Sequence, residues 1–71
     1  MITYQPISER DEIPFNEEVV LVFEGRNNYH YRIGMKMQSP SGREVLGVIG
    51  DKTPSGDCIA FGILNKFGAT Q

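Results

Sequence analysis

The sequence predicts an all-β fold in which about five antiparallel strands form a meander, as a twisted sheet or a small open barrel. Two observations support this prediction. Residues 29–38 alternate apolar and polar side chains, which is the two-residue period of a strand. Two Pro-Ser-Gly sequences, ending at Gly42 and Gly56, each precede an apolar run, and short turns between consecutive strands favour antiparallel neighbours. An N-terminal arm with at most one helical turn precedes these strands.

The length of the chain predicts a single domain over residues 1–71. We divide it into the arm (1–16), a hairpin meander (17–65) and a short tail (66–71). A hydrophobic fraction of 39% is sufficient for a folded core. The longest apolar run, residues 19–23, is too short to span a membrane, and the N-terminus lacks the pattern of a signal peptide. We therefore expect a cytoplasmic protein, in the host cytoplasm if it is phage-encoded, with no membrane contact.

The arm is expected to contain a short edge strand and one helical turn. Residues 2–4 alternate as a strand does. Ser8 and Asp11 have the spacing of a capping box, which predicts that Ser8 caps the turn. Pro14 disfavours helical backbone at Ile13 and so should end the turn there.

The strands differ in how their two sides are expected to be covered. Residues 19–23 are apolar at every position, which indicates a central strand covered on both faces. Residues 45–49 and 58–64 are further strands. In the strand 29–38 we expect the odd positions in the core and the even positions in water. The odd positions are Tyr29, Tyr31, Ile33, Met35 and Met37, and the even ones are His30, Arg32, Gly34, Lys36 and Gln38.

The two turns should use the same backbone solution. Proline suits the second position of a type I turn because its φ is fixed, and the glycine that follows can adopt a positive φ at little cost. Gly42 and Gly56 are therefore predicted to have φ > 0.

Nothing in the chain predicts catalysis. His30 and Cys58 are the only residues that could form a Cys-His nucleophile pair, and no motif places them together. One cysteine and one histidine cannot complete a four-ligand zinc site, and the acidic residues lack calcium-loop spacing. No glycine-rich phosphate motif is present. We expect no enzyme activity, no metal and no cofactor, with Cys58 as a small packed side chain and no internal disulfide.

The candidate binding surface is basic. His30, Arg32 and Lys36 share the predicted wet face of the strand 29–38, with Arg26 at its entrance and Arg43 across the next turn. A basic strand face is how small barrels hold single-stranded nucleic acid. The net charge of −2 and the placement of the tyrosines on the other face argue against that partner.

Three segments resemble a family of short phage and prophage proteins, the domain-of-unknown-function family 551. They are Tyr4–Glu9, the pair Ile13 and Pro14, and Asn16–Phe23. The resemblance implies a phage or mobile-element origin. It implies no activity and transfers no catalytic residue.

The function expected from these features is that of a non-catalytic binding module acting by protein–protein contact on a host protein, such as an antiviral defence component. Two alternatives stay open. One is a small β-barrel that binds single-stranded nucleic acid. The other is a homo-oligomer that binds a small nucleotide-like ligand at its subunit interface.

Overall fold

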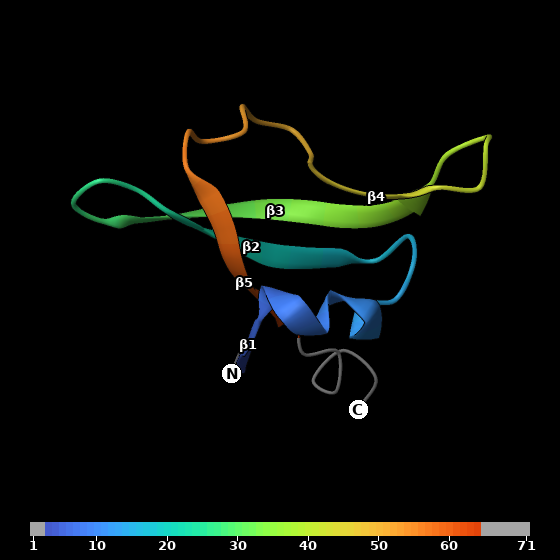
Figure 1. Ribbon diagram of the computed structural model, residues 1–71, viewed down its shortest axis with the longest axis horizontal. Helices are drawn as coiled ribbons and strands as arrows, with labels where there is room; N and C mark the ends of the chain where they lie inside the picture. Colours follow the sequence, from blue (N-terminus) through green and yellow to red (C-terminus); the bar gives the residue numbers. More distant parts are fainter. Residues whose placement is uncertain (1–2, 65–71) are drawn as a thin grey trace.

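The computed structural model describes residues 3–64, and its five strands form one antiparallel sheet in the order β1-β5-β2-β3-β4 (Figure 1). The elements in chain order are β1 (Tyr4–Pro6), the 3-10 helix η1 (Ile7–Glu12), β2 (Glu18–Glu24), β3 (Tyr29–Gln38), β4 (Glu44–Val48) and β5 (Asp57–Ile63). The predicted all-β class and the short helical element of the arm are confirmed. The sheet is open at β1 and β4, so it takes the form of a twisted sheet. Ile2 and the predicted tail 66–71 lie outside the described residues.

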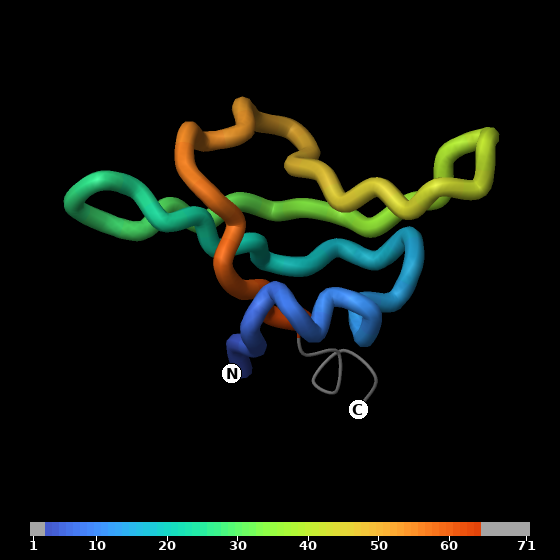
Figure 2. Tube along the Cα trace, viewed as in Figure 1, coloured from blue at the N-terminus to red at the C-terminus, as the bar shows by residue number. Residues whose placement is uncertain are grey.

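Strands β2, β3 and β4 form the expected meander, whereas β5 leaves it. After β4 the chain crosses back so that β5 pairs with β2, and β1 then pairs with the other side of β5. Figure 1 shows β5 running at a steep angle to β2 and β3. Its register with β2 shifts between Val22 and Phe23, and such a bulge bends a strand and increases its twist. The turns that precede β3 and β4 project at opposite ends of the molecule (Figure 2).

The hydrophobic core lies on one side of the sheet, which we call the core face. Val19, Leu21 and Phe23 of β2 point to this side, and Phe61 of β5 and Ile13 of the arm complete the buried cluster. The arm covers this face because Ile7 and Ile13 pack there together. All five residues of 19–23 are buried, as the sequence predicts.

The helical turn of the arm starts earlier than predicted. Pro6 is the N-terminal cap residue of η1, which makes no side-chain capping hydrogen bond, and Ser8 lies inside the helix rather than at its cap. Its end is as predicted, because Ile13 has extended backbone at φ −72° and ψ 122°, as a residue before proline prefers. Asn16 then turns the chain into β2 with a φ of 64°, a conformation that asparagine tolerates better than most residues.

The glycines of the two Pro-Ser-Gly sequences have the predicted positive φ. Gly42 has a φ of 89° and Gly56 a φ of 111°. In the first turn the Gly42 amide donates to the Ser39 carbonyl at 2.8 Å, which closes a β-turn. The second glycine lies against β2, where a Cβ would overlap the carbonyl oxygen of Glu24.

The predicted orientation of β3 is wrong. The alternation is present, but Tyr31 is 54% exposed and Lys36 only 3%. The cause is the register with β2, which pairs Arg32 with Leu21 and Gly34 with Val19. Directly paired residues point to the same side of a sheet, so the even positions of β3 share the core face. A period of two predicts the alternation of a strand and leaves open which side the arm will cover.

Candidate functional site

Lys36 of the predicted basic surface is buried beneath the arm. Its Nζ donates to the carbonyl oxygens of Arg10 at 3.3 Å and Asp11 at 3.4 Å. The same nitrogen lies 3.8 Å from Oε2 of Glu44 and 4.6 Å from the centroid of the Phe15 ring. These contacts join the end of η1 to β3 and β4. Lys36 is therefore a structural residue, and its charge does not lie on a wet face.

The other four residues of the predicted basic surface are not gathered into one patch. Arg32 is on the core face, with its Nε 3.4 Å from Oδ2 of Asp51. His30 is half-buried on the same face. Arg26 and Arg43 are exposed in the two turns that lie at opposite ends of the molecule (Figure 2). A single partner surface would have to reach along the whole of β3 to touch both.

The side of the sheet opposite the core face is apolar, and we call it the open face. Strand register places these side chains on it: Tyr4, Val20, Val22, Tyr29, Tyr31, Ile33, Met35, Met37 and Val45. Six of them are large and exposed, namely Tyr4, Tyr29, Tyr31, Ile33, Met37 and Val45. Sequence reasoning missed this surface because it assigned the odd positions of β3 to the core. The exposure of three aromatic side chains distinguishes the open face from the rest of the surface.

The centre of the open face is already well packed. Val20 and Val22 are only 8% and 7% exposed. The rings of Tyr4 and Tyr31 lie edge to face, with their centroids 6.1 Å apart. Large side chains from β1 and β3 thus close over the middle of the sheet. The open face is therefore a preformed surface of packed tyrosine, isoleucine and methionine side chains.

All charged residues that the five strands place on the open face are acidic. Glu24 pairs with both Tyr29 of β3 and Asp57 of β5, so two carboxylates lie at one end. Glu18 pairs with Met35 and supplies a carboxylate toward the other end. The open face is therefore an apolar stripe with negative charge near each end.

His30 and Cys58 do not form a nucleophile pair. His30 of β3 and Cys58 of β5 both pair with Phe23 of β2. Because β2 lies between them, they are two strand spacings apart, or about 10 Å. The Cys58 thiol donates to the Ala60 carbonyl at 3.7 Å. Burial raises the pKa of the thiol despite hydrogen bonds with the backbone of Ala60 and Val22. A raised pKa disfavours the thiolate, which is the nucleophilic form.

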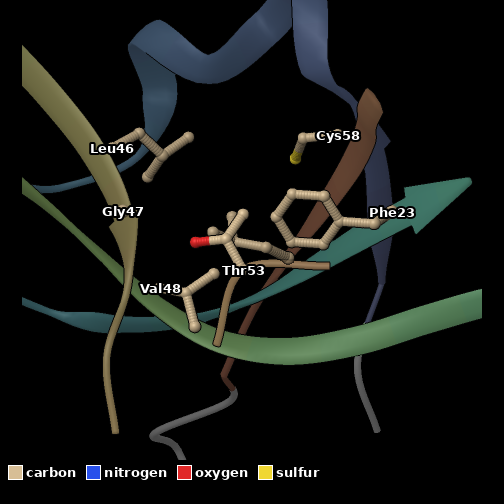
Figure 3. Close-up of a pocket in the computed structure, with 7 residues that line it drawn as sticks. Phe23, Leu46, Gly47, Val48, Thr53 and Cys58 are labelled. Atoms are coloured by element: carbon tan, nitrogen blue, oxygen red, sulfur yellow. The ribbon is translucent and has the colours of Figure 1, made fainter. Parts of the chain in front are cut away.

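A small pocket opens on the core face between β4 and the start of β5 (Figure 3). Its volume is about 100 Å³. The lining is almost entirely apolar, and its residues are Leu21, Phe23, Leu46, Gly47, Val48, Thr53 and Cys58. Sites for drug-sized ligands usually measure about 300–1,000 Å³, so this pocket fits a few carbon atoms and not a nucleotide. A wider hollow of about 360 Å³ is formed by one turn alone, residues 24–29.

No helix in residues 3–64 is long and apolar enough to cross a membrane. Nor do three His, Cys, Asp or Glu side chains in that range lie close enough together to hold a metal ion.

Comparisons with known protein families, curated proteins and solved structures find no match for the chain. The resemblance to phage proteins therefore stays a prediction. Among the surfaces described above, the open face is the most unusual, because its large apolar side chains are exposed.

Proposed function

We propose that this protein is a non-catalytic binding module that acts by protein–protein contact through its open face. The observation that supports this most directly is the exposure of Tyr29, Tyr31 and Met37, at 54%, 54% and 43%, on the side of the sheet opposite the packed Ile7 and Ile13. Tyrosine and methionine are enriched at protein interfaces relative to other surfaces.

The size of the exposed apolar area supports the proposal. An aromatic side chain has about 150–250 Å² to bury, so three tyrosines that are roughly half exposed present on the order of 300 Å². Ile33, Met37 and Val45 extend this area. The largest apolar patch on a typical monomer is about 300–600 Å² and is often functional. A standard interface buries about 800 Å² per partner, so the exposed apolar side chains would form its centre and the surrounding polar residues its rim.

The shape of the face also suits this role. β3 runs beside the central strand β2 for ten residues, and Tyr4 and Tyr31 hold each other in place above the valines of β2. Pre-ordered aromatic side chains lose little conformational entropy on binding, so they contribute more to affinity than mobile ones. The resemblance to phage proteins implies a phage origin and so favours a host protein as the partner.

A capture experiment from a bacterial host lysate tests the proposal. Wild-type protein is compared with Tyr31→Ser/Ile33→Ser, which removes two side chains from the open face. The matched control is Arg26→Ser/Arg43→Ser, which removes two exposed residues of the turns. We expect the open-face variant to lose the captured protein and the turn variant to keep it, with both variants folded by circular dichroism. Loss of the same protein by the turn variant alone would contradict the proposal.

A further inference from the structure

We infer that the partner segment bound by the open face is a basic amphipathic one, with an apolar stripe flanked by lysine or arginine near each end. This inference rests on the proposed function and specifies the chemistry of its partner.

The acidic residues are placed where a bound segment would pass over them. Glu24 and Asp57 are paired across β2 and β5, and Glu24 also pairs with Tyr29, the first residue of the stripe on β3. Glu18 pairs with Met35 near the other end. All three carboxylate side chains belong to exposed residues. A partner that covers the stripe brings its own rim within a few ångströms of these groups, where positive charge is favoured and negative charge is not.

The spacing of the acidic residues sets the spacing expected in the partner. Glu18 and Glu24 are the first and last residues of β2, and a strand rises about 3.3 Å per residue, so they are about 20 Å apart. An α-helix rises 1.5 Å per residue, so about 13 helical residues would separate the two basic groups. Such a helix would lay its apolar side along β3, as amphipathic helices do in apolar grooves.

A second copy of the chain is the less favourable occupant. Two open faces aligned along β2, in either direction, bring acidic residues at the strand ends opposite acidic residues, and the strands contribute no basic residue to this face that could compensate. Like charges across an interface are destabilising and suppress the wrong partner. Charge complementarity therefore favours a basic partner over self-association.

Two designed helical peptides of about 18 residues test this inference. Both carry the same leucine and alanine stripe, one with lysines near each end and the other with glutamates at the same positions. Binding is measured by fluorescence anisotropy at low salt. We expect the lysine peptide to bind the wild type at least about tenfold more tightly than the glutamate peptide. Tyr31→Ser/Ile33→Ser should abolish binding of both.

Charge-neutralised variants locate the preference. The variant Glu18→Gln/Glu24→Gln/Asp57→Asn should lose most of the preference for the lysine peptide over the glutamate peptide. The control Glu9→Gln/Asp11→Asn/Glu12→Gln removes the same net charge from the exposed arm and should keep that preference. Equal binding of the two peptides, no binding of either, or an equal loss of preference in the control would overturn the inference.

Two other occupants are outcomes of the same study. Sedimentation of the wild type alone should show a monomer, and a dimer that Tyr31→Ser/Ile33→Ser abolishes would mean that a second copy occupies the face. A gain in peptide affinity on removal of residues 65–71 would mean that the chain's own end occupies it. In a further outcome, Tyr31→Ser/Ile33→Ser loses the protein captured from lysate, but the wild type binds the two peptides equally. That result would refute the basic partner and leave the proposed function standing.

Discussion

The ring of Tyr4 lies edge-on to the ring of Tyr31, at 6.1 Å between centroids and an interplanar angle of 61°, although two strands separate β1 from β3. Strand register explains how the rings meet. Tyr4 is paired with Gly62 of β5, and Tyr31 is in line with Ala60 through Val22. Small residues at these β5 positions leave room for the tyrosine rings to lie across the sheet.

This pair should be energetically coupled. In a double-mutant cycle of Tyr4→Ala and Tyr31→Ala, we expect a coupling free energy of about 0.5–1.5 kcal/mol, as for other edge-to-face aromatic pairs. The measurement is the free energy of unfolding in urea. A second cycle of Tyr4→Ala with Val45→Ala, on the far edge strand, serves as the control and should be additive. Additive losses in the tyrosine cycle would show that the two rings do not support each other.

Gly42 and Gly56 are predicted to respond differently to the same substitution. Both have positive φ, which costs an alanine about 1 kcal/mol. Gly42 has open space around it, so Gly42→Ala should lose only that amount. At Gly56 a Cβ would also overlap the backbone carbonyl of Glu24, and overpacking of this kind adds roughly 1–3 kcal/mol. Equal shifts of the urea midpoint in the two variants would contradict the close approach of the second turn to β2.

Lys36 and Met37 are neighbours in β3 with opposite surroundings. Lys36→Glu places a carboxylate beside the carbonyl oxygens of Arg10 and Asp11 and the side chain of Glu44, so we expect it to cost several kcal/mol or to unfold the domain. Met37→Glu adds the same group at a side chain that is 43% exposed and should cost less than about 1 kcal/mol. Thermal melts compare the two directly. A more damaging change at Met37 would mean that β3 is oriented as its sequence alone suggests.

Local chemistry explains the parts of the fold that were predictable. The positive φ of Gly42 and Gly56 and the extended backbone of Ile13 before Pro14 could both be inferred from adjacent residues. The path of β5 could not be inferred in this way. The chain must return from β4 past β3 before β5 can pair with β2, and no local sequence pattern specifies such a connection. Once β5 lies beside β2, β4 and β1 become the edges of the sheet.

The expected wet face of His30, Arg32 and Lys36 is wrong for a related reason. The alternation in β3 is symmetric with respect to the two sides of the sheet, and the arm decides which side becomes the core. Lys36 then becomes buried because the arm's carbonyls and Phe15 satisfy its ammonium group, which no pattern in the strand itself reveals. Tyr29 and Tyr31, which the alternation predicts in the core, form the exposed surface instead.

The raised pKa of Cys58 predicts a pH-dependent stability. A thiol with a higher pKa in the folded state keeps its proton there while the unfolded chain loses it, so the free energy of unfolding falls as pH rises through the unfolded value. We expect this loss to begin at about pH 8 and to level off above the folded pKa. The measurement is urea unfolding at several pH values for the wild type and Cys58→Ala. If the difference between the two proteins does not change with pH, burial does not act on this thiol.

The basic residues of the chain do not form a surface suited to single-stranded nucleic acid. Lys36 is buried, Arg32 is close to Asp51, and Arg26 and Arg43 lie at opposite ends of the molecule (Figure 2). The tyrosines that could stack on bases lie on the open face, where the charged strand residues are acidic. Binding of a single strand needs stacking and phosphate contacts on one surface, and the net charge of −2 opposes the approach of a polyanion.

We therefore expect no binding of labelled DNA or RNA oligonucleotides tighter than roughly 10 μM at physiological salt, because non-specific contacts alone give about 10⁻⁴ to 10⁻⁶ M. Fluorescence anisotropy across a salt series provides the measurement. The outcome against this expectation is micromolar binding that weakens steeply with salt and is lost in Arg26→Ala/Arg43→Ala. Retention of such binding by Tyr31→Ser/Ile33→Ser would then separate it from the open face, and the turns at the two ends would become the functional surface.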